Sequence, residues 1–132
     1  MSSNPPGLRF VVLHHTGWSG HPDHYDLLLQ LNDGRDENDR VLKTFTTRED
    51  VFPSSGSTLK LNADHRRAYL NVEGAVSGDR GSVVRVDQGS LHWLRSTDRL
   101  FKFMLSGERL NGSFCIREMF HDAYRLEENS ES

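Results

Sequence analysis

The sequence contains a single cysteine, Cys115, so it can form neither an intramolecular disulfide nor a metal site built from several thiolates. So little cysteine is typical of a reducing compartment. No apolar run approaches the roughly 18 residues that a membrane-spanning helix needs. Residues 1–7 lack the basic and apolar regions of a secretory signal. We therefore expect a cytoplasmic protein with no membrane partner.

An excess of positive charge is also lacking. Sixteen Lys and Arg against nineteen Asp and Glu give the 132 residues a net charge of −3. This balance excludes a broadly basic nucleic-acid-binding protein but allows a local basic groove. The length suits one domain with its own core. We expect a flexible arm over residues 1–8, a single domain over residues 9–126 and an acidic tail over residues 127–132.

The sequence also lacks helical periodicity, because no segment carries an apolar stripe over three helical turns. Short apolar or alternating segments are instead separated by turn residues, a pattern typical of antiparallel sandwiches and barrels. We predict a mainly all-β fold, an antiparallel β-barrel of seven or eight strands with short flanking helical turns. A turn is expected at residues 87–89 and a short helix over residues 120–126. The expected strands are residues 9–13, 25–31, 41–45, 59–61, 81–86, 90–94, 101–105 and 113–117.

Four of the seven histidines lie within residues 14–24, an unusual concentration in a chain of this composition. Imidazole binds divalent transition metals near neutral pH. Alternation along the strand that follows puts His24 and Asp26 on one face, about 7 Å apart. His15 supplies a third ligand if the preceding strand pairs beside this one. The pattern predicts a metal site at His15, His24 and Asp26 inside the barrel, with positions open to water or substrate.

A simpler interpretation of this segment is also possible. The histidines can be exposed polar side chains, and Asp26 can cap a turn. His21 and Asp23 fit a surface loop, and they remain spare ligand candidates. Both interpretations are compatible with the spacing.

A second group of polar residues is the run Asp64-His65-Arg66-Arg67-Ala68-Tyr69. Here His65, next to two arginines, could act as a general acid or contact a phosphate. The alternative is a basic surface turn in which Tyr69 is an aromatic residue at the barrel edge. Cys115 lies in a predicted strand without a neighbouring histidine, so we expect a small buried apolar residue there. Phe101, Phe103 and Phe114 are expected in the core.

Several segments between about residues 9 and 118 follow one another in the order of a known module. They are Phe10-Val-Val-Leu-His-His15, His24-Tyr-Asp26-Leu-Leu-Leu-Gln-Leu31 with Val41-Leu-Lys-Thr-Phe45, Asp64-His65-Arg-Arg-Ala-Tyr69-Leu-Asn-Val-Glu73-Gly74, Gly81-Ser-Val-Val-Arg-Val-Asp87-Gln-Gly89 and Leu105-Ser-Gly-Glu-Arg-Leu-Asn-Gly112-Ser-Phe. In these segments and in their order, the chain resembles the 3′-phosphoesterase module of bacterial ATP-dependent DNA ligase D.

The resemblance implies an antiparallel β-barrel that holds a divalent metal, typically manganese, in a crescent-shaped groove. Zinc and cobalt are the alternative metals. The implied activity is the removal of 3′-phosphates or 3′-terminal ribonucleotides from nucleic-acid 3′ ends in DNA end repair. By motif position, the resemblance assigns the metal to His15, His24 and Asp26, and further catalytic roles to His65 and Tyr69. A DNA ligase or polymerase acting in trans is the implied partner, and the oligomeric state stays open.

The chain departs from the family at two phosphate-binding arginines, which are replaced by Leu28 and Ser57. A hydrogen bond to a charged group contributes about 1.5–3 kcal/mol. Losing two could therefore slow the reaction on the order of 10²- to 10⁴-fold if nothing substitutes. The stretch between His15 and His24 is also longer than in the family, which leaves His21 as an alternative ligand. Candidate substitutes for the arginines are Lys43, Lys60, Arg66 and Arg67.

Two alternative functions stay open beside this one. The first is a catalytically weak or inactive barrel that serves as a nucleic-acid or protein interaction module, since phosphate contacts dominate nucleic-acid affinity and this chain is acidic. The second is a metal-binding barrel of unrelated chemistry, such as an oxygenase-like site made of two histidines and a carboxylate. The order of the later segments argues against the second alternative.

Overall fold

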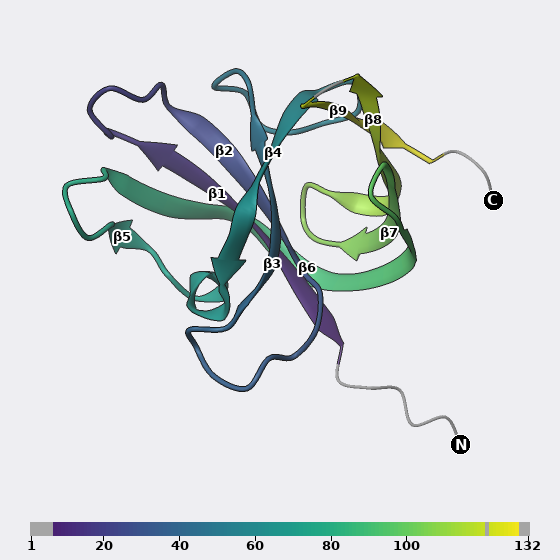
Figure 1. Cartoon of the computed structure of the whole chain (residues 1–132), viewed down its shortest axis with the longest axis horizontal. Helices are drawn as coiled ribbons and strands as arrows, with labels where there is room; N and C mark the ends of the chain where they lie inside the picture. The colour runs from purple at the N-terminus through teal and green to yellow at the C-terminus, as the bar shows by residue number, and fades with distance from the viewer. Residues whose placement is uncertain (1–6, 121, 130–132) are drawn as a thin grey trace.

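The computed structural model describes residues 7–120 and 122–129. Eight strands close into an antiparallel barrel in the order β1-β2-β3-β4-β9-β8-β7-β6, and β6 pairs back onto β1 (Figure 1). The predicted all-β barrel is therefore confirmed. A two-residue strand, β5, pairs with the start of β6. The elements are β1 (Leu8–Thr16), β2 (His24–Gln30), β3 (Arg40–Thr47), β4 (Thr58–Arg66), the 3₁₀ helix η1 (Arg67–Leu70), β5 (Gly74–Ala75), β6 (Ser82–Ser96), β7 (Leu100–Ser106), β8 (Asn111–Phe120) and β9 (Ala123–Glu128).

The ends of the barrel lie close to the predicted domain limits. The strands begin at Leu8 and end at Glu128, so both predicted limits fall inside strands. Residues 1–6 of the predicted arm and residues 130–132 of the predicted tail lie outside the described residues. Within the described part, no helix has the length and apolar character needed to span a bilayer.

The predicted turn at residues 87–89 is wrong, because β6 continues through it without interruption. The first part of this 15-residue strand pairs with β1 and the last part with β7, so one strand serves both sides of the barrel. Gly89 lies so close to the backbone of Ser106 that any side chain there would collide with it. Glycine therefore allows a close approach between strands, where the sequence pattern indicated a turn.

The predicted helix over residues 120–126 is also wrong. Residue 121 lies outside the described residues, and from Ala123 on the chain forms β9, in which buried Tyr124 and Leu126 alternate with exposed Arg125. A period of two places both apolar side chains on the interior face of a strand, whereas a helix would separate them. β9 completes the barrel by pairing with β8 along its length and with β4 at two positions.

The barrel interior is filled by one apolar cluster to which all eight closing strands contribute. Phe101, Phe103 and Phe114 belong to it, as predicted. Cys115 is 5% exposed, which also agrees with the prediction. The members of the cluster are Phe10, Val12, Leu27, Leu29, Phe45, Leu59, Leu91, Phe101, Phe103, Leu105, Leu110, Phe114, Ile116, Tyr124 and Leu126.

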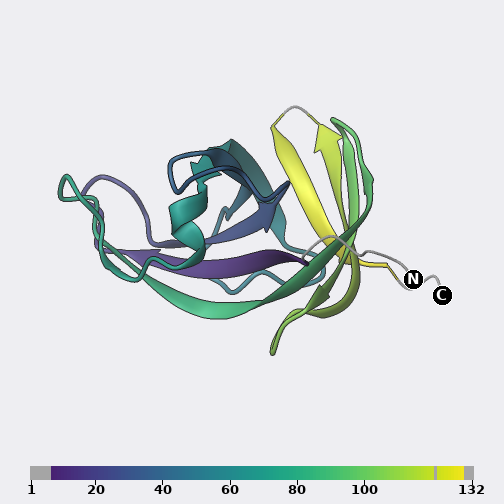
Figure 2. The same ribbon diagram turned by 90° about the horizontal axis from the view of Figure 1, so that it is seen from below.

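A second apolar cluster covers the opposite, outer face of β1 and β2. Side chains alternate along a strand, so Val11, Leu13 and Leu28 point away from the interior. Leu70 of η1 packs onto them. Figures 1 and 2 show η1 beside β1 to β4, on the side of the molecule away from β7, β8 and β9. This part of the barrel wall is therefore buried on both faces.

A buried carboxylate, Asp87 of β6, anchors the β7–β8 turn. It is 5% exposed and accepts hydrogen bonds from the backbone N–H groups of Glu108 (2.9 Å), Arg109 (3.1 Å) and Leu110 (2.7 Å). The backbone N–H of Gln88 donates a further bond of 2.9 Å. Hydrogen bonds to an ionised acceptor are stronger than neutral ones, so this side chain joins β6 firmly to the hairpin.

We predict that Asp87→Asn lowers the free energy of unfolding by about 3 kcal/mol. The amide removes the negative charge and places an N–H₂ donor against backbone donors. Urea denaturation followed by circular dichroism measures the change, with exposed Asp98→Asn as the matched control. Equal unfolding free energies for Asp87→Asn and the wild type would contradict this role.

Candidate metal centre

The register between β1 and β2 brings together the three predicted ligands. His15 lies directly opposite His24, and Asp26 follows two residues later on the same face of β2. One ligand atom from each of the three side chains lies within 4.8 Å of the others. His15 and Asp26 are buried, at 8% and 5% exposure.

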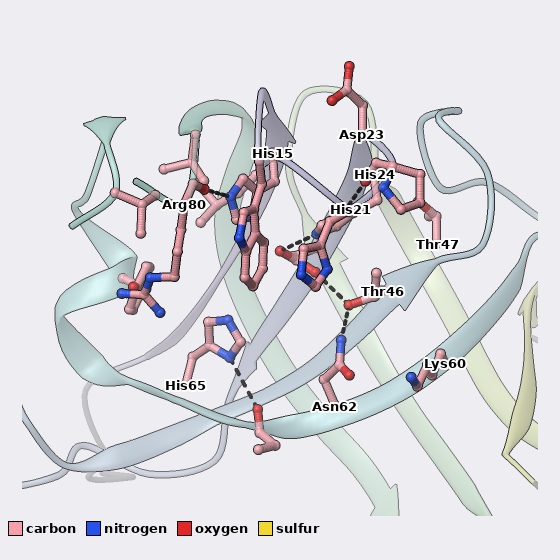
Figure 3. A pocket seen from close by; sticks show the side chains of 18 of the residues that line it. His15, His21, Asp23, His24, Thr46, Thr47, Lys60, Asn62, His65 and Arg80 are labelled. Atoms are coloured by element: carbon pink, nitrogen blue, oxygen red, sulfur yellow. Dashed lines mark hydrogen bonds and ion pairs between the residues drawn. The ribbon is translucent and has the colours of Figure 1, made fainter. Parts of the chain in front are cut away.

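The cluster lies on the outer face of the barrel wall. The prediction that it lies inside the barrel is wrong. Side chains two residues apart on a strand point to the same face. His15 therefore faces outward like Val11 and Leu13, and Asp26 faces outward like Leu28. The interior could not take these groups, because apolar side chains fill it. The cluster instead opens into a cavity of about 600 Å³ (Figure 3).

Backbone carbonyls orient both imidazoles. The carbonyl of Pro22 accepts from His24 Nδ1 (3.0 Å), and the carbonyl of Arg80 accepts from His15 Nε2 (2.5 Å). A carbonyl can only accept, so in the neutral rings the protons lie on these nitrogens. Nε2 of His24 and Nδ1 of His15 therefore carry the free lone pairs, as metal-binding histidines require.

A chain of two polar side chains orients Asp26. The hydroxyl of Thr46 donates to Asp26 Oδ1 at 2.6 Å. In turn, Asn62 Nδ2 donates to the oxygen of Thr46, as Figure 3 shows. Oδ1 is thus occupied, which leaves Oδ2 for other partners. Oδ2 lies 3.4 Å from His24 Nε2.

The proximity of His24 and Asp26 shifts both of their pKa values. The hydrogen bond to Asp26 raises the pKa of His24 above its ordinary 6.5, although burial acts in the opposite direction. Burial raises the pKa of Asp26, but the hydrogen bonds from His24 and Thr46 outweigh it and hold the pKa below its ordinary 3.8. Asp26 is therefore ionised at neutral pH, and when His24 is protonated, the proton on its Nε2 occupies the place that a cation would take.

Two imidazoles and one carboxylate suit a first-row divalent cation such as manganese, zinc or cobalt. Ligand atoms bonded to one ion at about 2.1 Å lie at most about 4.2 Å apart. The three atoms here, all within 4.8 Å of one another, need only small side-chain rotations to reach that arrangement. His15, His24 and Asp26 could therefore hold a cation and leave coordination positions open toward the cavity.

A bulge in β4 turns His65 into the same cavity. Thr44 of β3 pairs with Asn62 and Leu42 pairs with His65, so β4 carries one extra residue between these pairs. In a regular strand, residues 62 and 65 point to opposite faces. Without this bulge, His65 would therefore point away from the cavity that Asn62 lines. His65 Nδ1 donates to Thr44 Oγ1 at 3.0 Å, because the Thr44 hydroxyl itself donates to the Leu42 carbonyl. Nε2 of His65 is left for a ligand.

Tyr69 of η1 also lines the cavity and packs edge-on against His65, with ring centroids 5.1 Å apart. The guanidinium of Arg66 lies 5.7 Å from the centroid of the Tyr69 ring. The second predicted group is thus brought next to the first, because His65 and Tyr69 line the same cavity as His15, His24 and Asp26.

The two positions where the family has arginine do not reach the cavity. Leu28 is fully buried in the second apolar cluster. Ser57 lies in the loop before β4, where its Oγ accepts from the Ser54 backbone N–H at 2.9 Å. Neither side chain is part of the cavity lining.

Of the candidate substitutes, Lys60 lines the cavity and the other three do not. Lys43 lies over the Phe101 ring, on the interior face, at 5.3 Å. Arg67 is paired with Glu37 at 2.9 Å. Three further cations line the cavity although no periodicity or motif in the sequence marks them: Arg40, Arg48 and Arg80.

The cavity is positively charged although the chain is acidic. Its four cations face two carboxylates, Asp23 and Asp26, which gives a net charge of +2 with neutral histidines. Within the described residues, Arg40, Lys60 and Arg80 form no ion pair with a carboxylate. An anionic ligand therefore finds an excess of cations here.

The spare candidates His21 and Asp23 also border the cavity, but they are not part of the three-ligand cluster. The ring of His21 stacks on Trp18, with centroids 3.7 Å apart. Asp23 Oδ1 accepts from the backbone N–H of Gly17 at 3.0 Å. The structure thus places His24, and not His21, beside His15 and Asp26.

Neither protein-family models nor curated protein sequences give a match to this chain. The resemblance to the ligase D module therefore rests on the segments quoted above. The chemical character of the cavity is an independent guide to function.

We predict that manganese affinity rises with pH through the raised pKa of His24. A cation must displace the proton on Nε2, so binding releases a proton at low pH and affinity falls by up to about tenfold per pH unit. Titration calorimetry between about pH 6 and pH 8.5, in buffers of different ionisation enthalpy, measures both effects. An affinity that does not change with pH, with no proton release, would contradict this competition.

We predict that Thr46→Val weakens manganese binding by about 10- to 100-fold. The variant keeps the side-chain shape but leaves Asp26 Oδ1 without its donor, so the carboxylate is free to rotate. Thr46→Ser retains the hydroxyl and should bind like the wild type. Thr58→Val, an exposed Thr on β4, is the matched control. Equal manganese affinities for Thr46→Val and Thr46→Ser would exclude this orienting role.

Proposed function

We propose that the protein is a metal-dependent phosphoesterase that acts on nucleic-acid 3′ ends and removes a 3′-phosphate or a 3′-terminal ribonucleotide. One observation carries the proposal: a cluster suited to a divalent cation, a histidine with a free Nε2 and four cationic side chains share one cavity. Phosphate esters are the common ligands for such a combination. The resemblance to the ligase D module supports the choice of 3′ ends.

The metal would be held by His15 Nδ1, His24 Nε2 and Asp26 Oδ2, and manganese is the proposed ion. When bound, such a cation polarises a phosphoryl oxygen and so favours attack at phosphorus. The hydrogen bonds from the rings to the Pro22 and Arg80 carbonyls fix the orientation of both imidazoles for this purpose.

His65 is the proposed proton donor. Its Nδ1–H is anchored on Thr44 Oγ1, so the ring keeps Nε2 directed into the cavity. Protonated Nε2 first donates a hydrogen bond to the phosphate. During hydrolysis, water adds to phosphorus and the P–O bond to the 3′ carbon's oxygen breaks. His65 gives its proton to that oxygen, and the products are a 3′-hydroxyl and inorganic phosphate.

The cations of the cavity take over the role of the two absent arginines. Lys60 lies on the β4 wall with His65, and Arg40 donates to the Asp64 carbonyl at 3.1 Å on the neighbouring strand. Charge-assisted hydrogen bonds from such groups contribute about 1.5–3 kcal/mol each. Tyr69 packs against His65 and restricts the position of its ring.

The product of the proposed reaction determines the proposed partner. A 3′-hydroxyl end is the substrate of strand joining and of strand extension, so a DNA ligase or polymerase acting in trans is the partner that would use it. The positively charged cavity on the outer face of the barrel is compatible with the approach of a nucleic-acid end.

A second candidate function is a metal-binding interaction module without catalysis. The replacement at position 28 favours it, because the buried apolar side chain of Leu28 cannot contact a phosphate. The net charge of −3 points in the same direction. This candidate predicts metal binding without turnover.

The experiment supplies the purified protein with manganese and a primer–template that ends in a 3′-phosphate or a 3′-ribonucleotide. We expect phosphate or nucleoside release that chelation abolishes and manganese restores. His65→Ala should reduce the rate by about 10²- to 10⁴-fold, and His24→Ala should lose manganese binding as well. His92→Ala, at an exposed histidine on β6, is the matched control. Manganese binding with no release from either end would refute the phosphoesterase and favour the interaction module.

A further inference from the structure

Three aromatic rings form a continuous stack that leads outward from the candidate metal ligands. His15 stacks on Trp18 with centroids 5.4 Å apart and an angle of 18°. Trp18 stacks in turn on His21, at 3.7 Å and 20°. Each ring is therefore nearly parallel to the next one, and the innermost ring belongs to the candidate metal cluster.

The loop between β1 and β2 is folded so that it holds this stack. The backbone N–H of His21 donates to the Trp18 carbonyl at 2.9 Å, which closes a turn. Gly20, with φ of 82°, allows the reversal that lays the His21 ring on the indole. The outer ring of the stack is thus positioned by the backbone.

The outer face of the stack is available to a ligand. His21 is exposed and lines the cavity, and only one of its two faces can lie against Trp18. Figure 3 shows His21 on the same side of the cavity as His15, with His65 and Lys60 projecting from the strand that crosses below. The cavity therefore has an aromatic wall and a cationic wall.

We infer that the stack formed by Trp18 and His21 binds the nucleobase of the terminal nucleotide. This inference rests on the proposed function and narrows its substrate to ends that carry a base next to the phosphate. Bases stack on aromatic side chains, histidine included, at about 1–3 kcal/mol per base. A nucleotide presents an anion and a flat ring a few bonds apart, which matches the two walls. A base-free phosphate ester can occupy only the cationic wall.

The inference also assigns a role to His21 that differs from metal ligation. A ligand must direct a ring nitrogen at the ion, whereas a stacking residue uses the ring face. His21→Phe separates the two roles, because it keeps a flat ring and removes both nitrogens. His21→Ala removes both functions together.

The test compares two oligonucleotides that end in a 3′-phosphate, one with a normal terminal base and one with an abasic terminal nucleotide. Binding is measured by fluorescence anisotropy of the labelled oligonucleotides, and turnover is measured with manganese. The wild type should prefer the end with a base by about 5- to 150-fold in Kd. His21→Phe should keep this preference and the wild-type manganese affinity, whereas His21→Ala should lose most of the preference. Ser19→Ala, in the same loop, is the matched control.

The outcomes distinguish this inference from the proposed function. A base preference that depends on the His21 ring supports the inference even if neither end is hydrolysed. Absence of hydrolysis would overturn only the phosphoesterase proposal. Turnover of both ends with equal Kd values overturns the inference and leaves the phosphoesterase intact. Loss of manganese binding in His21→Phe also overturns it, because His21 would then be a ligand. Circular dichroism confirms that each variant is folded.

Discussion

The antiparallel register of β1 and β2 is the constraint on which the candidate site depends. It sets His15 opposite His24, with Asp26 two residues further on. A slip of one residue would turn every β2 side chain to the other face and would separate the three groups. Apolar packing on both faces prevents this slip, because Leu27 fills the interior and Leu28 fills the outer cluster, both with no exposed surface. The core of the barrel and the polar cluster are thus specified by the same strand pair.

Hydrogen bonds around this strand pair orient the ligand atoms of the cluster before a ligand binds. Carbonyl acceptors fix the free nitrogens of both histidines, and Thr46 with Asn62 fixes one oxygen of Asp26. The remaining carboxylate oxygen lies 3.4 Å from His24 Nε2, so a divalent cation can bind between them without reorganising the backbone. Because the cluster lies on the outer face, a long polymer can approach it, which an interior site would not allow.

The sequence predicted the parts of this structure that follow from local periodicity. Local patterns identified the closing strands other than β9, and alternation placed His24 and Asp26 on one face, which needs only a spacing of two. Alternation does not say which face is interior, so the site was predicted on the wrong side of the wall. The bulge that turns His65 into the cavity and the cations Arg40, Arg48 and Arg80 depend on pairing between distant strands, which no local pattern records. The stack on Trp18 depends on a loop whose conformation its sequence does not reveal.

A crystal structure of the protein soaked in manganese chloride, with anomalous diffraction at the manganese edge, would show which side chains hold the ion. We expect one strong anomalous peak bonded at about 2.0–2.3 Å to His15 Nδ1, His24 Nε2 and Asp26 Oδ2. An absent peak, or a peak held by His21 and Asp23 instead, would contradict it.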